Sequence, residues 1–156
     1  PTVSDVRVNV RADTVQINDV SMPEYAINQE IPIHQADGSL TTDTSRLWAD
    51  LPDRAMQGAL TRQLNVITDA SVASEPWPLS GFPEVEVSIF VDDMIVQANS
   101  TLRLTGTYAM KSEVGRDRVG TFAIVTPVAD LASYTAIIAA HEAAWQQLSE
   151  QLARDL

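Results

Sequence analysis

The chain has no cysteine, so a disulfide, a thiolate nucleophile and a cysteine-ligated metal site are excluded for its 156 residues. No apolar run approaches the roughly 18 residues that a membrane-spanning helix needs. Basic residues are also scarce, since 10 lysines and arginines face 21 aspartates and glutamates, for a net charge of -11. A surface with this charge repels a phosphate backbone and an anionic bilayer. The composition therefore argues against nucleic acid as a partner and against membrane attachment through the folded surface.

What is present is the composition of a folded domain. Hydrophobic residues make up 45% of the chain and charged residues 20%, whereas disordered chains have low hydrophobicity. A chain of this length can bury one core, so we expect a single domain over residues 1–156. The sequence starts at Pro1 without a basic or apolar leader segment, which is compatible with a leader removed upstream.

Alternating apolar and polar residues predict the strands. The clearest alternation is EVEVSIFV, residues 84–91, after which Asp92 and Asp93 are expected to form a bulge or a turn. The parity of the apolar positions changes between Val10 and Val15, so a turn or bulge is also expected there. The predicted strands cover residues 5–10, 15–20, 31–35, 72–75, 84–91, 94–98, 101–110 and 121–125.

Apolar residues at three- and four-residue steps predict two longer helices. The first runs from about residue 51 to about residue 67, with Pro52 in its first turn and Asp50 as its cap. The second begins after Asp130, a natural cap, and continues to the C-terminal residues. A short helical turn is expected to start at Pro23.

The order of these elements predicts the fold class. Asp37 and Gly38 indicate a tight turn after the strand at 31–35, and residues 43–45 offer further candidate helix caps. Strands, a helix, several antiparallel strands and a long terminal helix are typical of an α+β domain. We therefore expect a mainly antiparallel, or mixed, sheet with the two main helices packed on one face.

The chain contains residue types that serve in catalysis or metal binding, but they do not stand in the known catalytic, metal-binding or phosphate-binding motifs. His34 and His141 have no ligand at metal-binding spacing, so we predict a solvated His34 and a structural His141. Asp92 and Asp93 could act as acid and base or hold a divalent cation, but neighbours in a strand point to opposite faces, which favours a solvated turn or edge. GRDRVG, residues 115–120, indicates a hairpin loop of mixed charge, because it lacks the motifs of a phosphate-binding loop. No catalytic residue, cofactor or metal is predicted.

The three tryptophans could line a ligand groove. Trp48 and Trp145 fall on apolar helical stripes and are predicted to be core residues, Trp48 as an anchor just ahead of the first long helix. Trp77 lies in a loop between two prolines, where it could be an exposed contact residue or a packed one. Trp77 is therefore the candidate residue for contact with a partner or ligand.

The segment from Met22 to Leu64 resembles a known family. LWADLPDRAMQGALTRQL, residues 47–64, is similar to the RWAEPL-plus-helix segment of the PqiC-type ABC-transport auxiliary lipoproteins. MPEYA, residues 22–26, corresponds to their LPxYL-like turn, and residues 31–34 correspond to the strand that follows. The later order also matches, with a Pro-Trp loop, a β-meander and a terminal helix.

The resemblance implies a small periplasmic lipoprotein of a Gram-negative bacterium, anchored to the outer membrane by an acylated N-terminal cysteine that is not in this chain. It implies MCE-domain or transporter subunits as partners. The implied role is non-enzymatic, as an auxiliary component of an ABC/MCE-type envelope lipid transport system that acts by protein–protein docking. The alternative is an envelope binding module that itself holds a lipid or other apolar ligand near Trp77. Homo-oligomerisation is left open, and neither the transported substrate nor the partner-facing surface follows from the sequence.

Overall fold

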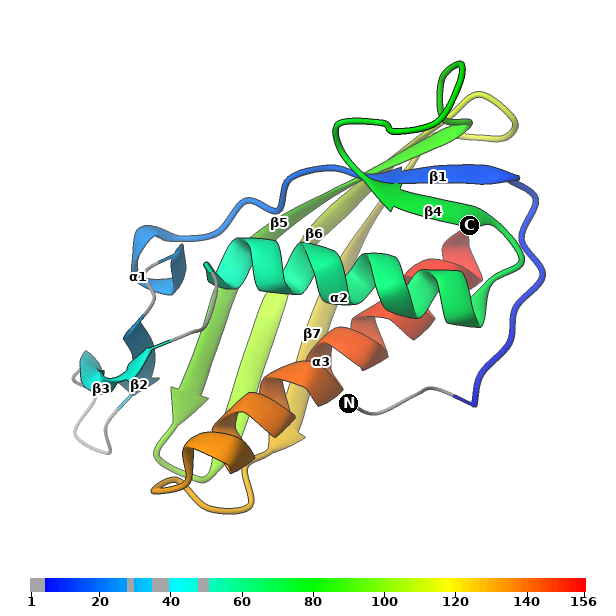
Figure 1. The fold of residues 1–156 in the computed structure, drawn as a ribbon. Coiled ribbons are helices and arrows are strands. Elements are labelled where there is room, and N and C mark those ends of the chain that lie inside the picture. The colour runs from blue at the N-terminus through cyan, green and yellow to red at the C-terminus, as the bar shows by residue number, and fades with distance from the viewer. Residues whose placement is uncertain (1–4, 28–29, 35–39, 48–50) are drawn as a thin grey trace.

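The computed structural model describes residues 5–27, 30–34, 40–47 and 51–156. Within these ranges the chain forms one sheet and three helices (Figure 1). No helix in the described ranges is long and apolar enough to cross a membrane. In chain order the elements are β1 (Thr14–Ile17), α1 (Glu24–Ile27), β2 (Glu30–His34), β3 (Leu40–Leu47), α2 (Pro52–Ile67), β4 (Ser71–Ser74), β5 (Val85–Gln97), β6 (Thr101–Ser112), β7 (Arg118–Pro127) and α3 (Tyr134–Asp155).

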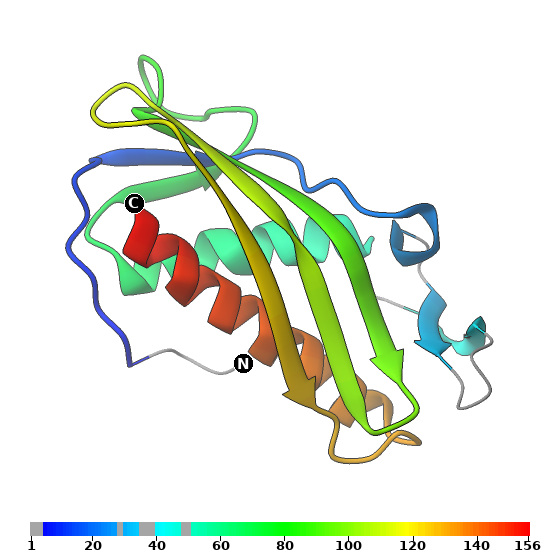
Figure 2. The ribbon, with the colours of Figure 1, turned by 180° about the vertical axis from the view of Figure 1, so that it is seen from behind.

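The sheet is mixed and is built on the long antiparallel meander β5–β6–β7. On its other side, β5 pairs in parallel with β1 near its start and with β2 near its end. Strand β4 adds to β1 in parallel, and β3 adds to β2 antiparallel. Both long helices lie on one face of the meander, and the view from behind shows the strands in front of them (Figures 1 and 2). The predicted α+β class, with the two main helices on one face of the sheet, is confirmed.

The core fills the space between the meander and the two helices. Strand β6 shows the alternation most clearly, because Leu102, Leu104, Tyr108 and Met110 are all buried as their shared parity predicts. The facing surfaces of α2 and α3 supply leucines such as Leu60 and Leu148, both with no exposed area. Burying one such side chain contributes roughly 2 kcal/mol to folding, so this layer supplies much of the favourable free energy.

Strand β5 decides between the bulge and the turn that were expected at Asp92 and Asp93. The two predicted segments, 84–91 and 94–98, form one continuous strand. Its register with β6 shifts between Val91 and Asp93, so the extra residue is Asp92 and the expected bulge is confirmed.

The helix starts differ in part from the predictions. Pro52 occupies the first turn of α2 as predicted, and the cap position belongs to Leu51, whose side chain makes no capping hydrogen bond. Residues 43–45 lie in β3, so their prediction as helix caps was wrong. Helix α3 is capped by Ser133, whose side chain accepts a hydrogen bond from a backbone N–H three residues on. Asp130 instead stabilises the turn before that cap, because its carboxylate accepts from Ala132 N–H at 2.9 Å.

Residues 5–10 do not form the predicted strand. They make one isolated bridge, between Val8 and Thr68, and Val8 N–H donates to the carbonyl of Ile67 at 2.7 Å. The valines of the segment are half-buried and the residues between them are exposed, so the predicted facing was right. The segment runs along the end of α2, where only one ladder contact forms.

Several predictions concern residues outside the described ranges. These are the cap at Asp50, the core role of Trp48 and the tight turn at Asp37 and Gly38. Strands β2 and β3 on either side of that turn pair antiparallel, as a hairpin requires. The side chain of His34, at the end of β2, also lies outside the described part.

Candidate functional site

The predicted contact residue, Trp77, lies in the loop of residues 75–84 between β4 and β5. Its ring is half-buried, and its indole N–H is enclosed without a hydrogen-bond partner in the described part of the chain. The exposed apolar side chains of this loop belong to its later residues, with Leu79 51% exposed and Phe82 94% exposed. The contact role of Trp77 stays a prediction, whereas Leu79 and Phe82, which the sequence reading did not single out, present apolar surface to solvent. We call these two residues the loop tip.

A cavity of about 480 Å³ lies beside the start of this loop. Its lining is polar. The side-chain amide of Gln57 donates hydrogen bonds to the carbonyl of Ile17 at 3.0 Å and to the carboxylate of Asp19 at 3.3 Å. The other lining residues are Arg54, Gly58, Ser74, Glu75 and Pro76. Such a lining does not suit an apolar ligand.

The acidic pair in β5 does not converge. Asp92 is exposed at the bulge, whereas Asp93 forms an ion pair with Arg103 at 3.4 Å and accepts hydrogen bonds from Thr105 at 3.2 Å and Tyr25 at 3.3 Å. Burial raises the pKa of Tyr25, so its hydroxyl keeps the proton that it donates to Asp93. No group of three or more histidine or acidic side chains in the described ranges could hold a metal ion. Asp93 therefore has a structural role in the sheet.

His141 is a core histidine, as predicted. Its ring is 1% exposed, and Nδ1 lies 2.8 Å from the carbonyl oxygen of Ile137. Burial lowers the pKa of His141 to about 4. The ring is therefore neutral near pH 7, and Nδ1–H donates to that carbonyl. Trp145 packs against it with ring centroids 6.0 Å apart, which places this tryptophan in the core.

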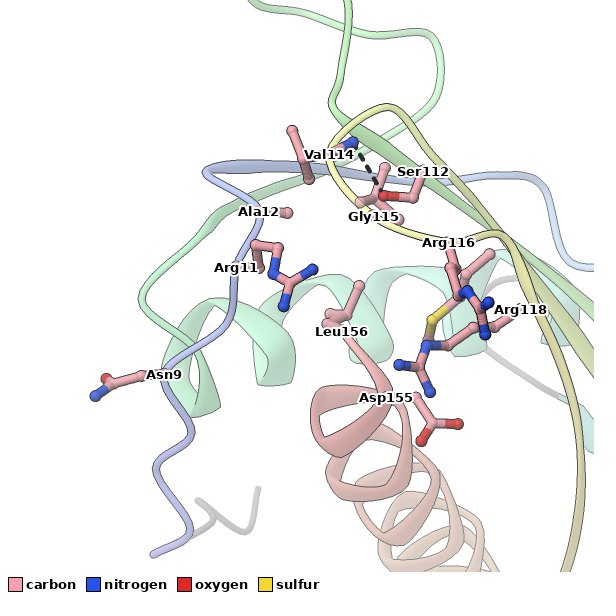
Figure 3. Close-up of a pocket in the computed structure, with 12 residues that line it drawn as sticks. Asn9, Arg11, Ala12, Ser112, Val114, Gly115, Arg116, Arg118, Asp155 and Leu156 are labelled. Carbon is pink, nitrogen blue, oxygen red and sulfur yellow. Dashed lines mark hydrogen bonds between the residues drawn. The ribbon is translucent and has the colours of Figure 1, made fainter.

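The structure brings together three arginines that lie far apart in the sequence. Arg11 precedes β1, whereas Arg116 and Arg118 belong to the β6–β7 hairpin, and all three line a pocket of about 330 Å³ (Figure 3). The end of α3 closes one side with Asp155 and Leu156. We call this the arginine pocket.

Backbone hydrogen bonds fix the hairpin side of the arginine pocket. Ser112 N–H donates to the carboxylate of Asp117 at 2.9 Å, and Val114 N–H donates to the hydroxyl of Ser112 at 3.2 Å (Figure 3). Glu113 N–H donates to the carbonyl of Glu84 at 2.8 Å, which ties the hairpin to the start of β5. The floor is apolar, with Ala12, Val85 and Met110 all less than 5% exposed.

The pocket is lined mainly by positive side chains, whereas the chain as a whole is negatively charged. Arg11, Arg116 and Arg118 are exposed, and none has a carboxylate within ion-pair distance in the described ranges. Asp155 is the carboxylate of the lining, and it accepts a hydrogen bond from the hydroxyl of Tyr108. Burial raises the pKa of Tyr108, so this phenol stays a donor. Three guanidinium groups against one side-chain carboxylate leave the side chains of the pocket with a net positive charge in a chain of net charge -11.

The sequence contains one signal for this pocket. Arg116 and Arg118 lie two residues apart in the β6–β7 hairpin, with Arg118 at the start of β7, but nothing local indicates that Arg11 joins them. That contact arises because β1 pairs with β5 beside the β6–β7 hairpin.

Comparisons with known proteins agree with this architecture. A family model described as "ABC-type transport auxiliary lipoprotein component" matches residues 2–153. A crystal structure of an uncharacterised protein has a TM-score of 0.79 at 14% identity, covering 97% of this chain and 99% of its own. A protein of the DUF330 family from Xanthomonas campestris has a TM-score of 0.70 at 16% identity, covering 97% and 91%. A PelC dodecamer from Paraburkholderia phytofirmans has a TM-score of 0.52 at 10% identity, covering 93% and 92%. At these identities the structures show a shared fold alone. A search of curated proteins gave no match.

Proposed function

Because this chain belongs to the family of ABC-type transport auxiliary lipoprotein components, we propose that it acts as a non-enzymatic accessory of an envelope lipid transport system. In this proposal it docks onto a protein partner, such as an MCE-domain or transporter subunit, and does not transform a substrate. The catalytic candidates of the sequence support this role, because His141 is buried in the core and Asp93 is paired with Arg103.

The observation that carries the docking proposal is the exposed loop tip. Phe82 leaves 94% of its side chain in water and Leu79 leaves 51%, although a domain of this size has a core that could take them. Burying one large apolar side chain in an interface contributes roughly 2 kcal/mol, and such side chains commonly dominate binding energy. An exposed pair of this kind is typical of a contact surface.

The loop tip stands on a fixed support. The loop follows β4 and leads into β5, and Glu84 at its end is tied to the β6–β7 hairpin by the bond from Glu113. The loop and the hairpin lie side by side at one end of the sheet in both ribbon views (Figures 1 and 2). A partner would therefore meet this end of the molecule, away from the β2–β3 hairpin.

The alternative function, an envelope module that itself holds a lipid or other apolar ligand near Trp77, has less support. The cavity beside that loop is lined by charged and amide groups, and Gln57 donates within it to the carboxylate of Asp19. An apolar ligand would have to leave those groups unpaired, at a cost of about 1–3 kcal/mol each.

Attachment and assembly complete the proposal. We place the protein in the periplasm, held at the outer membrane by an acylated cysteine upstream of Pro1, and the encoded sequence upstream of Pro1 tests this directly. Self-association fits the edge strand β7, where Val119 is 78% exposed and Val125 58% exposed. Light scattering of the purified protein would measure the oligomeric state.

Affinity purification of the intact lipoprotein from envelopes tests the docking role. The wild type should recover a transporter or MCE-domain subunit. Phe82→Ser should weaken that binding by about thirtyfold and lower the recovery, since burial of the ring contributes roughly 2 kcal/mol. Val66→Ser is the matched control, because it removes an exposed apolar side chain from α2. Equal recovery by the Phe82 variant and the wild type would refute the loop tip as the docking surface.

A further inference from the structure

We propose that the arginine pocket binds a phosphate group, carried either by a lipid headgroup or by a small soluble molecule. The site shares no residue with the loop tip, and the proposal does not depend on the docking function.

The rim of the arginine pocket is positively charged. Arg11, Arg116 and Arg118 are three of the chain's 10 basic residues, and they line one cavity without an ion-pair partner in the described part of the chain. Guanidinium groups brought together in this way repel one another, and a bound anion removes that repulsion. The planar fork of arginine donates paired hydrogen bonds to phosphate oxygens, which suits this anion.

Open space separates Arg11 from Ser112 of the hairpin. Nη1 of Arg11 lies 3.6 Å from the point where a Cβ at Gly115 would stand, and the hydroxyl oxygen of Ser112 lies 3.5 Å from the same point. A glycine at this position therefore leaves the guanidinium and the hydroxyl facing one another without an intervening side chain (Figure 3). Ser112 accepts a hydrogen bond from Val114, and its own O–H has no acceptor within the described residues, so it can donate to an anion.

The floor of the pocket is apolar. Ala12, Val85 and Met110 form an apolar base under the charged rim, and the volume of about 330 Å³ lies at the small end of ligand pockets, which span roughly 300–1,000 Å³. A phosphate at the rim would leave room for the first carbons of an attached chain on this base. Asp155 opposes the anion from one side and limits its affinity.

The net charge of -11 is compatible with this site. Charges farther away than about 8 Å are largely screened at physiological ionic strength, so a single phosphate responds mainly to the rim. A long phosphate polymer would meet the acidic surface as well, which is why the composition still argues against nucleic acid. The backbone of residues 115–120 is not the binding element in this proposal; the arginine side chains are.

Nuclear magnetic resonance on the 17.0 kDa protein tests the site, with inorganic phosphate, glycerol 3-phosphate and dihexanoyl phosphatidic acid as probes at constant ionic strength. The arginine Nε–H signals and the amide of Gly115 should shift in a saturable way. Arg116→Gln with Arg118→Gln should weaken binding by about tenfold or more, since hydrogen bonds to charged groups are the strong ones. Arg54→Gln with Arg62→Gln on α2 is the matched control, because it removes the same two charges outside the pocket.

A second variant separates a shaped site from general attraction. Gly115→Leu keeps every charge but places a side chain between Arg11 and Ser112, so it should abolish saturable binding while the rest of the spectrum keeps its folded pattern. Equal affinity for all three probes would identify a soluble phosphate as the ligand, and tighter binding of the phosphatidic acid would identify a lipid headgroup; either result supports the site. Absence of saturable shifts, or unchanged binding by the double arginine variant or by Gly115→Leu, would overturn the proposal.

Discussion

Buried His141 should make the stability of this protein fall as the pH drops through a defined window. Its pKa is about 4 in the folded chain, against 6.5 for a free histidine side chain. Above pH 6.5 the ring is neutral in both states and adds no pH dependence. Between pH 6.5 and about 4 the unfolded chain binds a proton that the folded chain does not, so unfolding becomes more favourable as the pH falls.

The size of the effect follows from the two pKa values. One pKa unit corresponds to about 1.4 kcal/mol, so the full shift lowers the free energy of unfolding by about 3 kcal/mol at the acid end of the window. A typical domain has a total stability of roughly 5–15 kcal/mol, so the loss should be readily measurable. The physical cause is the removal of the imidazolium from water in a core where the hydrogen bond to the carbonyl of Ile137 does not offset the cost of burial.

Urea unfolding at pH 7 and at about pH 4, followed by tryptophan fluorescence, measures this contribution. Carboxylates also titrate in that range, so the informative quantity is the difference between the wild type and His141→Met, a variant with no titrating ring. The wild type should lose about 3 kcal/mol more than the variant. His34→Gln, which removes the protein's other histidine, should keep the wild-type behaviour. Parallel pH profiles for the wild type and His141→Met would refute the assignment of a buried neutral ring.

Two further substitutions test the packing of the meander. Gly106→Ala should destabilise the protein by about 2 kcal/mol or more in urea unfolding, because its methyl group would collide with the backbone carbonyl of Phe90, which cannot move aside as a side chain would. Gly115→Ala is the control and should be nearly neutral, because its methyl group meets only ordinary contacts. Equal losses of stability in the two variants would contradict this explanation. Tyr108→Phe should cost about 1 kcal/mol by removing the hydrogen bond to Asp155, and a smaller loss in the Asp155→Asn background would show that the two groups act as a pair.

The elements predicted best from the sequence are those that local pattern alone determines. Strand β6 buries Leu102, Leu104, Tyr108 and Met110 because strict alternation fixes their face once one side of the sheet is covered. Pro52 likewise marks the first turn of α2, because its fixed φ and missing N–H suit that position. The bulge at Asp92 was one of two alternatives, and pairing with β6 selects it.

The misses arise where tertiary contacts decide. Residues 43–45 are good helix caps by type, but pairing with β2 places them in a strand. Residues 5–10 alternate correctly, yet they meet the end of α2 and form only one bridge. Ser133 replaces Asp130 as the cap of α3 because only the geometry of the turn shows which side chain reaches the free N–H groups.

The candidate sites depend still more on long-range contacts. No spacing rule connects Arg11 with Arg116, since parallel pairing of β1 with β5 brings the N-terminal segment to the hairpin. The exposure of Phe82 could not be predicted from the sequence either, because an apolar residue between glycine and proline fits a packed loop and an exposed one equally well. Trp77 was predicted as the contact residue because it lies between two prolines in a loop, whereas Phe82 in the same loop carries the exposed surface.

Photocrosslinking in living cells tests the central claim most directly. A photoreactive amino acid would replace Phe82 in the full-length lipoprotein, and the same amino acid at Val66 would serve as the control position. Docking through the loop tip predicts a crosslink from position 82 to a subunit of a lipid transporter, and none from position 66. A position-82 probe that reaches no transporter subunit, or one that reaches it no more than position 66 does, would contradict the proposed function.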